Sequence, residues 1–243
     1  MKQGTIQVNT RMKCGWRTGR GLYFVARALF LTAMTIGLCT NLRAQASPDV
    51  HAVAQKVDKY YNGLHSLRVH FAESYDGLGM NRSESGVLIL LKPGRMRWDY
   101  ESPAGKVFLI DGKFAWFYTQ GSPQVQRIPA KRLDDLRSPL SLLLGHTQLE
   151  KEFTGLRLEQ NSQNQNTFVL TGQPKGQENR VRHVSLTIAR SSGAITAIEI
   201  EEVDGALTHF TFTGDQPNVA VPESAFRFTP PAGITVVDAL PPA

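Results

Sequence analysis

The chain has 243 residues and a formal net charge of +6, from 27 basic and 21 acidic residues. The excess is confined to residues 1–46, which hold seven Lys or Arg and no acid, so residues 47–243 have 20 basic and 21 acidic side chains, a net −1. This balance gives no support for binding nucleic acid or an anionic membrane. Both cysteines, Cys14 and Cys39, also precede residue 47, which excludes disulfides, thiol nucleophiles and cysteine metal sites from the remainder.

The first 46 residues have the features of a secretory signal peptide. A basic leader is followed by an apolar run at residues 28–39 and then by Ala44-Gln45-Ala46, a small-x-small cleavage site. A membrane-spanning helix needs about 20 apolar residues, so this run is short for an anchor. We therefore expect cleavage between Ala46 and Ser47, with residues 47–243 exported as a single domain.

Three alternatives at the leader stay open. Translation starts at Met1 or, because the basic leader is long, at Met12. An uncleaved anchor over residues 22–39 is the second alternative. The third is lipid modification of Cys39, which is disfavoured because Leu38 stands where a small residue is required.

A helix is predicted directly after the cleavage site. Ser47-Pro48-Asp49 supplies a capping hydroxyl, a proline for the first turn and an acid near the positive helix end. Gly63 offers an end to the helix. The apolar residues between these signals recur at helical spacing: Val50, Val53, Val57, Tyr60 and Leu64.

The rest of the chain is predicted to be mainly antiparallel strands. The turn signals Lys92-Pro93-Gly94 and Asp111-Gly112 are too short for a parallel crossover, so they join antiparallel neighbours. Strands are expected at residues 67–75, 86–91, 95–100, 106–110, 114–118, 153–159, 167–171, 181–189, 194–203 and 207–213.

A second, leucine-rich helix interrupts the strands. Ser138-Pro139 resembles a helix start and Gly145 a helix end. The segment between them is apolar nearly all round, so it must be buried or must cover something apolar.

Three predicted strands, around residues 87–91, 107–110 and 114–118, are apolar on both faces. A long antiparallel sheet curls, and two helices can close one side of it. The interior is then either a filled core or a hydrophobic pocket, and the pattern does not choose between them. Met96, Trp98 and Tyr100 share one strand face by alternation. The full set of candidate cavity residues is Val53, Val57, Met96, Trp98, Tyr100, Phe108, Trp116, Leu140, Leu143 and Leu144.

Catalytic signatures are missing from the sequence. Neighbouring acids such as Asp134-Asp135 and Glu201-Glu202 point to opposite faces of a strand, so they form no catalytic dyad. No nucleophile motif or phosphate-binding loop occurs. The histidines have no metal-ligand spacing: His51, His65, His70, His146, His183 and His209. We therefore expect a ligand-binding protein without catalytic residues, metal or cofactor.

Three segments carry a specific resemblance. Gly86-Val87-Leu88 leads into residues 92–100 (KPGRMRWDY) and Pro103; residues 110–118 form the next hairpin; residues 226–236 (FRFTPPAGITV) come near the end. In this order and spacing they resemble the periplasmic outer-membrane lipoprotein carrier family, LolA. The resemblance implies an incomplete antiparallel barrel of about eleven strands, with a helical lid over an apolar cavity.

The resemblance also implies partners and a role. Family members accept the acyl chains of lipoproteins from an inner-membrane ATP-driven release complex and deliver them to an outer-membrane receptor, and we expect this chain to be a monomer. Relatives often latch the lid with an arginine where this chain has Lys92, a less directional donor. We expect Lys92 to donate to carbonyls near residues 140–145. The alternatives are a lipoprotein-sensing regulator built on the same half-barrel and an exported lipid-processing enzyme.

Overall fold

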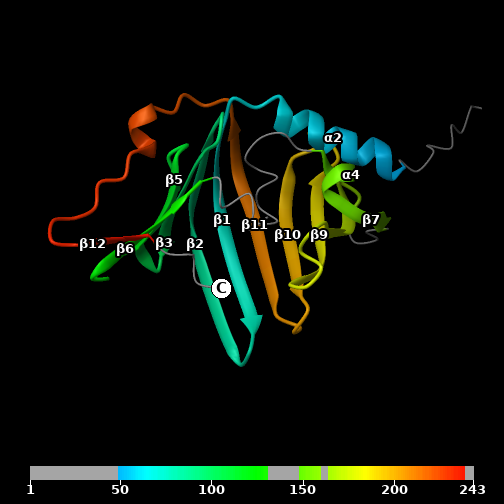
Figure 1. Ribbon diagram of the computed structural model, residues 1–243. Coiled ribbons are helices and arrows are strands. Elements are labelled where there is room, and N and C mark those ends of the chain that lie inside the picture. The colour runs from blue at the N-terminus through cyan, green and yellow to red at the C-terminus, as the bar shows by residue number, and fades with distance from the viewer. Residues whose placement is uncertain (1–48, 131–147, 160–163, 239–243) are drawn as a thin grey trace, which may run out of the picture. The chain divides into compact units, whose positions relative to one another are not determined.

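Twelve strands form one continuous sheet in the computed structural model, which describes residues 49–130, 148–159 and 164–238 (Figure 1). The order across the sheet is β12-β6-β5-β4-β3-β2-β1-β11-β10-β9-β8-β7, and its edges are β12 and β7. The strands are β1 (Ser66–Gly77), β2 (Met80–Leu91), β3 (Arg95–Ser102), β4 (Ala104–Ile110), β5 (Phe114–Thr119), β6 (Gln124–Pro129), β7 (Phe153–Glu159), β8 (Thr167–Pro174), β9 (Val181–Ala189), β10 (Ile195–Glu202), β11 (Leu207–Pro217) and β12 (Thr235–Asp238).

The sheet confirms the predicted mainly β, open antiparallel class. The predicted turns are in place: Asp111 Oδ1 accepts from the backbone N–H of Lys113 and of Phe114, both at 2.7 Å, and Gly112 has φ 94°. Two strands were not predicted, β6 and β12. β12 pairs with β6 in parallel, through Thr235 opposite Gln124, whereas all other neighbours are antiparallel.

Helix α2 (Val50–Asn62) is the predicted N-terminal helix, and it lies across one end of the sheet (Figure 1). Its cap is Asp49 and not Ser47, because the Asp49 carboxylate accepts from Ala52 N at 2.7 Å. Gly63 ends the helix, as expected, and donates to Lys59 O at 3.1 Å. The buried face consists of Val53, Ala54, Val57 and Tyr61, so Tyr61 takes the place expected of Tyr60.

The sheet face towards α2 holds the main hydrophobic core, and we call it the core face. Side chains from β1–β5 and β7–β11 join α2 and the short helix α4 (Leu149–Glu152) in one connected cluster. Strand alternation decides membership: Leu88 and Leu90 of β2 are in the cluster, whereas the intervening Ile89 is not.

The opposite face of β3–β5 is covered by the C-terminal segment. The 3₁₀ helix η2 (Glu223–Phe226) packs against β3, and Arg97 Nη1 donates to Ala225 O at 3.0 Å. Beyond η2, Phe228 contacts the Trp116 ring at 5.5 Å between centroids. Cover for the second apolar face therefore comes from an extended segment near the C-terminus. The predicted leucine-rich helix, with Leu140, Leu143 and Leu144, lies outside the described residues.

Candidate ligand-binding face

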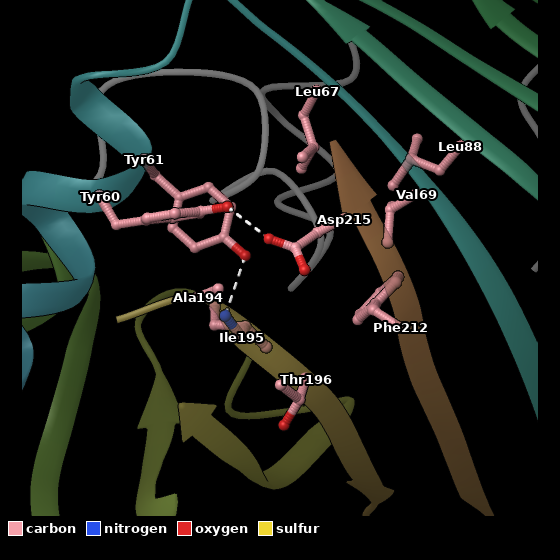
Figure 2. Close-up of a pocket in the computed structure, with 10 residues that line it drawn as sticks. All are labelled: Tyr60, Tyr61, Leu67, Val69, Leu88, Ala194, Ile195, Thr196, Phe212 and Asp215. Carbon is pink, nitrogen blue, oxygen red and sulfur yellow. Dashed lines mark hydrogen bonds between the residues drawn. The ribbon is translucent and has the colours of Figure 1, made fainter. Parts of the chain in front are cut away.

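A small pocket opens on the core face beneath the C-terminal end of α2 (Figure 2). Its volume is about 20 Å³, roughly the room for one water molecule. Apolar side chains make most of the lining: Tyr60, Tyr61, Leu67, Val69, Leu88, Ala194, Ile195, Thr196, Phe212 and Asp215. This pocket as it stands is too small for an acyl chain.

Two tyrosines tie α2 to the far side of this pocket (Figure 2). Tyr60 donates its hydroxyl to Asp215 Oδ2 at 3.1 Å, and Tyr61 Oη accepts from Ile195 N at 3.1 Å. Burial, followed by the Asp215 charge, raises the pKa of Tyr60 to about 12. Burial also raises the pKa of Tyr61 well above its usual value. Both hydroxyls therefore stay protonated in the physiological range.

Lys92 provides a third tie, directly after β2. Its Nζ donates to Tyr61 O at 2.5 Å, at the C-terminal end of α2 where carbonyls lack partners within the helix. Desolvation lowers the pKa of the Lys92 ammonium. The partners expected near residues 140–145 lie outside the described residues, so a latch role for Lys92 stays a prediction.

A row of aromatic rings crosses the middle of the core face, and we call it the aromatic row. It consists of Tyr100, Trp98, Phe71, Phe210 and Phe212. The Phe71 ring lies edge-on to Trp98 at 4.6 Å and to Tyr100 at 5.1 Å between centroids. β2 passes between β1 and β3 at this point with Gly86, which is paired with both Phe71 and Tyr100.

Gly86 is required at this crossing. A Cβ there would lie 1.9 Å from Asp99 O, far inside contact distance with the backbone. Without a side chain at this position, the rings on either side can meet above the strand. The glycine of the sequence motif is therefore explained by close packing against the neighbouring strand and not by a turn or a helix cap.

Beyond the aromatic row the core face becomes charged. Glu73 and Glu84 stand opposite each other across β1 and β2, and two cations neutralise them. Lys106 Nζ lies 2.6 Å from Glu84 and 4.2 Å above the centre of the Tyr100 ring, while Arg82 lies 3.2 Å from Glu73 and 3.6 Å from Glu84. We call Glu73, Arg82, Glu84 and Lys106 the charged collar. It separates the aromatic row from the β1–β2 turn.

Most predicted cavity residues come together on the core face. Val53, Val57, Met96 and Trp98 are buried in the core cluster, and Trp98 Nε1 donates to Met96 Sδ at 2.9 Å. Tyr100 and Phe108 are partly buried against the same cluster. Whether these residues bind a ligand stays a prediction.

Trp116 is on the other face of the sheet, contrary to the prediction. Its indole donates to Asp111 Oδ2 at 2.8 Å and its ring packs on Phe228. On β5, Ala115 and Phe117 face the core, so Trp116 between them must face away. The prediction counted aromatic residues and overlooked this alternation. Phe117, which stacks on Phe108 at 4.5 Å, holds the expected place.

Sequence reasoning also missed residues on other strands. Phe71, Phe210 and Phe212 lie in segments correctly predicted as strands but were not assigned to the site. Their period-two spacing was a usable signal for a shared face. The signal for Tyr61 was weaker, because Tyr60 and Tyr61 both fit the edge of one helix face.

The described residues contain no group of three or more His, Cys, Asp or Glu side chains placed to hold a metal ion. Within residues 49–130, 148–159 and 164–238, no helix is both long and apolar enough to cross a membrane. Apart from the charged collar, the described part of the core face is a continuous apolar and aromatic surface.

The comparisons with known proteins agree on one family. The family described as "Outer membrane lipoprotein carrier protein LolA" matches residues 72–229. The chain is similar to the outer-membrane lipoprotein carrier protein of Chromobacterium violaceum, with 29% identity over 85% of this chain and 95% of that protein. The protein of the same description from Nitrosospira multiformis is 31% identical over 64% of this chain and 73% of its own length.

The fold has a solved counterpart. An uncharacterized conserved protein from Thermus thermophilus aligns with a TM-score of 0.52 and 14% identity, over 78% of this chain and 98% of that one. At this identity the likeness concerns the fold alone.

Proposed function

The chain belongs to the outer membrane lipoprotein carrier protein LolA family, and from this premise we propose that its core face binds the acyl chains of lipoproteins. The observation that carries the proposal is the continuous apolar and aromatic surface beneath α2. A carrier role accounts for this surface better than catalysis does, because the described core face brings together aromatic and aliphatic groups.

Acyl-chain energetics explain why a protein carrier is needed. Each buried methylene is worth about 0.8 kcal/mol, so two or three long chains hold a lipoprotein in its membrane by tens of kcal/mol. A protein that offers an alternative apolar surface makes transfer possible. It must also release the chains, so its own surface cannot be too favourable.

Binding requires the core face to open. The pocket of about 20 Å³ lies under α2, and α2 is fastened there by the hydroxyls of Tyr60 and Tyr61 and by the Lys92 ammonium. Each such contact contributes about 1–3 kcal/mol, so the three together are outweighed by the burial of one long acyl chain at about 0.8 kcal/mol per methylene. We propose that displacement of α2 exposes the face to acyl chains.

The family also suggests where the protein works. We propose that residues 47–243 act in the periplasm after cleavage near Ala46, as a monomer. The proposed partners are an inner-membrane ATP-driven release complex, acylated lipoproteins and an outer-membrane receptor.

The test compares two neighbouring side chains of β5 that face opposite ways. Phe117 is partly buried on the core face, and Tyr118 contacts Phe228 on the other face at 5.9 Å between ring centroids. Titration with a fluorescent fatty acid should show one saturable site, weakened about tenfold or more by Phe117→Gln, since a lost aromatic contact is worth at least about 1.5 kcal/mol. Tyr118→Gln is the matched control and should bind as the unmodified protein does. Equal effects of the two substitutions would contradict binding on the core face.

A further inference from the structure

Four of the five large hydrophobic side chains that are exposed in the described part of the chain gather at the turns of two hairpins. Leu78 (74% exposed) and Met80 (59%) lie at the β1–β2 turn, and Val203 (45%) and Leu207 (41%) lie at the β10–β11 turn. The fifth, Val236, is on β12. We call the first four residues the tip patch.

The two turns form one surface. Leu207 pairs with Asp76 across β1 and β11, and a Cβ on Gly77 would lie 2.4 Å from Ala206 Cβ, so the turns are in direct contact. Both turns lie at the end of their strands away from α2 (Figure 1). The tip patch therefore adjoins the charged collar, at the opposite end of the core face from the pocket.

The backbone of Leu78 is unfavourable for a leucine. Its φ is 52° and that of Gly79 is 74°, so both central turn residues are left-handed. Such turns favour Asn-Gly, because the short polar side chain of asparagine can hydrogen-bond locally in the left-handed conformation, which the apolar side chain of leucine cannot. An exposed leucine in a disfavoured conformation serves neither the turn nor the core, and this combination points to contact with something outside the chain.

We propose that the tip patch enters the apolar boundary of a phospholipid bilayer. Four side chains on two convex turns are few for a protein interface, which buries about 800 Å² on each partner. Single apolar side chains can insert between lipid headgroups without a complementary partner surface. The charges beside the turns are mostly acidic, with Asp76 at one turn and Glu202 and Asp204 at the other, while Arg82 is paired with Glu73 and Glu84. This pattern favours a zwitterionic over an anionic lipid surface.

The inference rests on the proposed function for its purpose. Contact through the tip patch would bring the collar end of the core face to the membrane, so that acyl chains would travel a short path between bilayer and protein. The contact itself requires only the tip patch, and it can be measured without any cargo.

The experiment is flotation of the exported protein with protein-free phosphatidylcholine vesicles. Leu78→Asn should lower the partition coefficient between vesicles and solution about tenfold or more, the factor expected for one leucine removed from an apolar surface. The same substitution should raise the midpoint of urea unfolding, because asparagine accepts the left-handed conformation. Val236→Asn, which changes the exposed valine of β12, should leave vesicle binding unchanged.

Three results would overturn the inference. The first is that the unmodified protein does not bind phosphatidylcholine vesicles, and the second is that Leu78→Asn binds them equally well. The third is that Leu78→Asn weakens binding only to native membrane vesicles, which would assign the patch to a protein partner. Fatty-acid binding in solution is measured on the same variants. If it persists while vesicle binding fails, the membrane contact is wrong and the carrier function stands.

Discussion

Glu73 and Glu84 illustrate what single residues contribute to this sheet. Their side chains are only 9% and 6% exposed and they face each other across two strands. Burial, and then the charge of Glu84, raises the pKa of the Glu73 carboxyl, although Arg82 opposes the shift. A raised pKa means that the folded protein favours the protonated carboxyl over the ionised one. The stabilisation of the fold that comes from the protonated group is therefore lost as the pH rises through that pKa.

Glu73→Gln should therefore stabilise the protein at neutral pH and much less in acid. Below the unfolded value near 4.5, Glu73 is protonated in both states, and the advantage of glutamine disappears. The measurement is the free energy of urea unfolding for both proteins at about pH 4 and pH 7. Glu101→Gln, at an exposed position of β3, serves as the control. A stability difference of the same size at both pH values would show that ionisation of Glu73 is not its cause.

Helix α2 is the element on which ligand access depends. It buries Val53, Val57 and Tyr61 against the sheet, and polar contacts at its C-terminal end fix its position. One of these contacts joins Lys92, directly after β2, to the carbonyl of Tyr61 near the end of α2. The Lys92 side chain can be changed without opening a cavity in the core.

Lys92→Met should remove this contact and lower the free energy of unfolding by about 1.5 kcal/mol, the usual worth of a hydrogen bond from a charged donor. Because α2 then leaves the sheet more easily, stopped-flow uptake of a fluorescent fatty acid should become faster. Lys92→Arg keeps a donor with a more directional geometry and should slow uptake. Lys113→Met, in the exposed β4–β5 turn, should change neither quantity. Uptake rates that are identical in all three variants would remove the latch role from Lys92.

The C-terminal segment is the second element with a defined task. It covers the face of β3–β5 that α2 cannot reach, and its last part, β12, then pairs with β6. A side-chain contact adds to this pairing, because Arg127 Nε of β6 donates to Asp238 Oδ1 of β12 at 2.8 Å. Both faces of these strands are thereby covered, one by the core and the other by the chain end. This explains why strands of an antiparallel sheet can be apolar on both faces.

For the molecule as a whole, ligand binding is a competition between the packed core face and a new interior filled by acyl chain. The opening cost is the same for every ligand, whereas the gain grows with each methylene. Affinity for saturated fatty acids should therefore rise about fourfold for each added methylene, the equivalent of about 0.8 kcal/mol, until the accessible face is full. Competition against a fluorescent fatty acid would measure this series. Affinities that do not depend on chain length would indicate binding at a polar surface site instead.

The open β class, the N-terminal helix and most strand positions followed from the sequence by itself. These features depend on local signals: alternation along β3, the Asp111-Gly112 turn, and apolar residues at helical spacing before Gly63. The motif at residues 86–103 added the family, because the resemblance needs only residue identity and spacing.

Tertiary structure alone decided which side chains share a surface. Trp116 faces the C-terminal segment because the pairing of β5 with its neighbours fixes which of its side chains point to the core face. β12 becomes a parallel edge strand because it pairs with β6, which lies more than 100 residues earlier in the chain. Gly86 and Tyr61 also acquire their roles from distant partners, Asp99 O and Ile195 N. Local patterns constrain the period of a segment, whereas the free energy that selects among its possible neighbours comes from long-range packing and pairing.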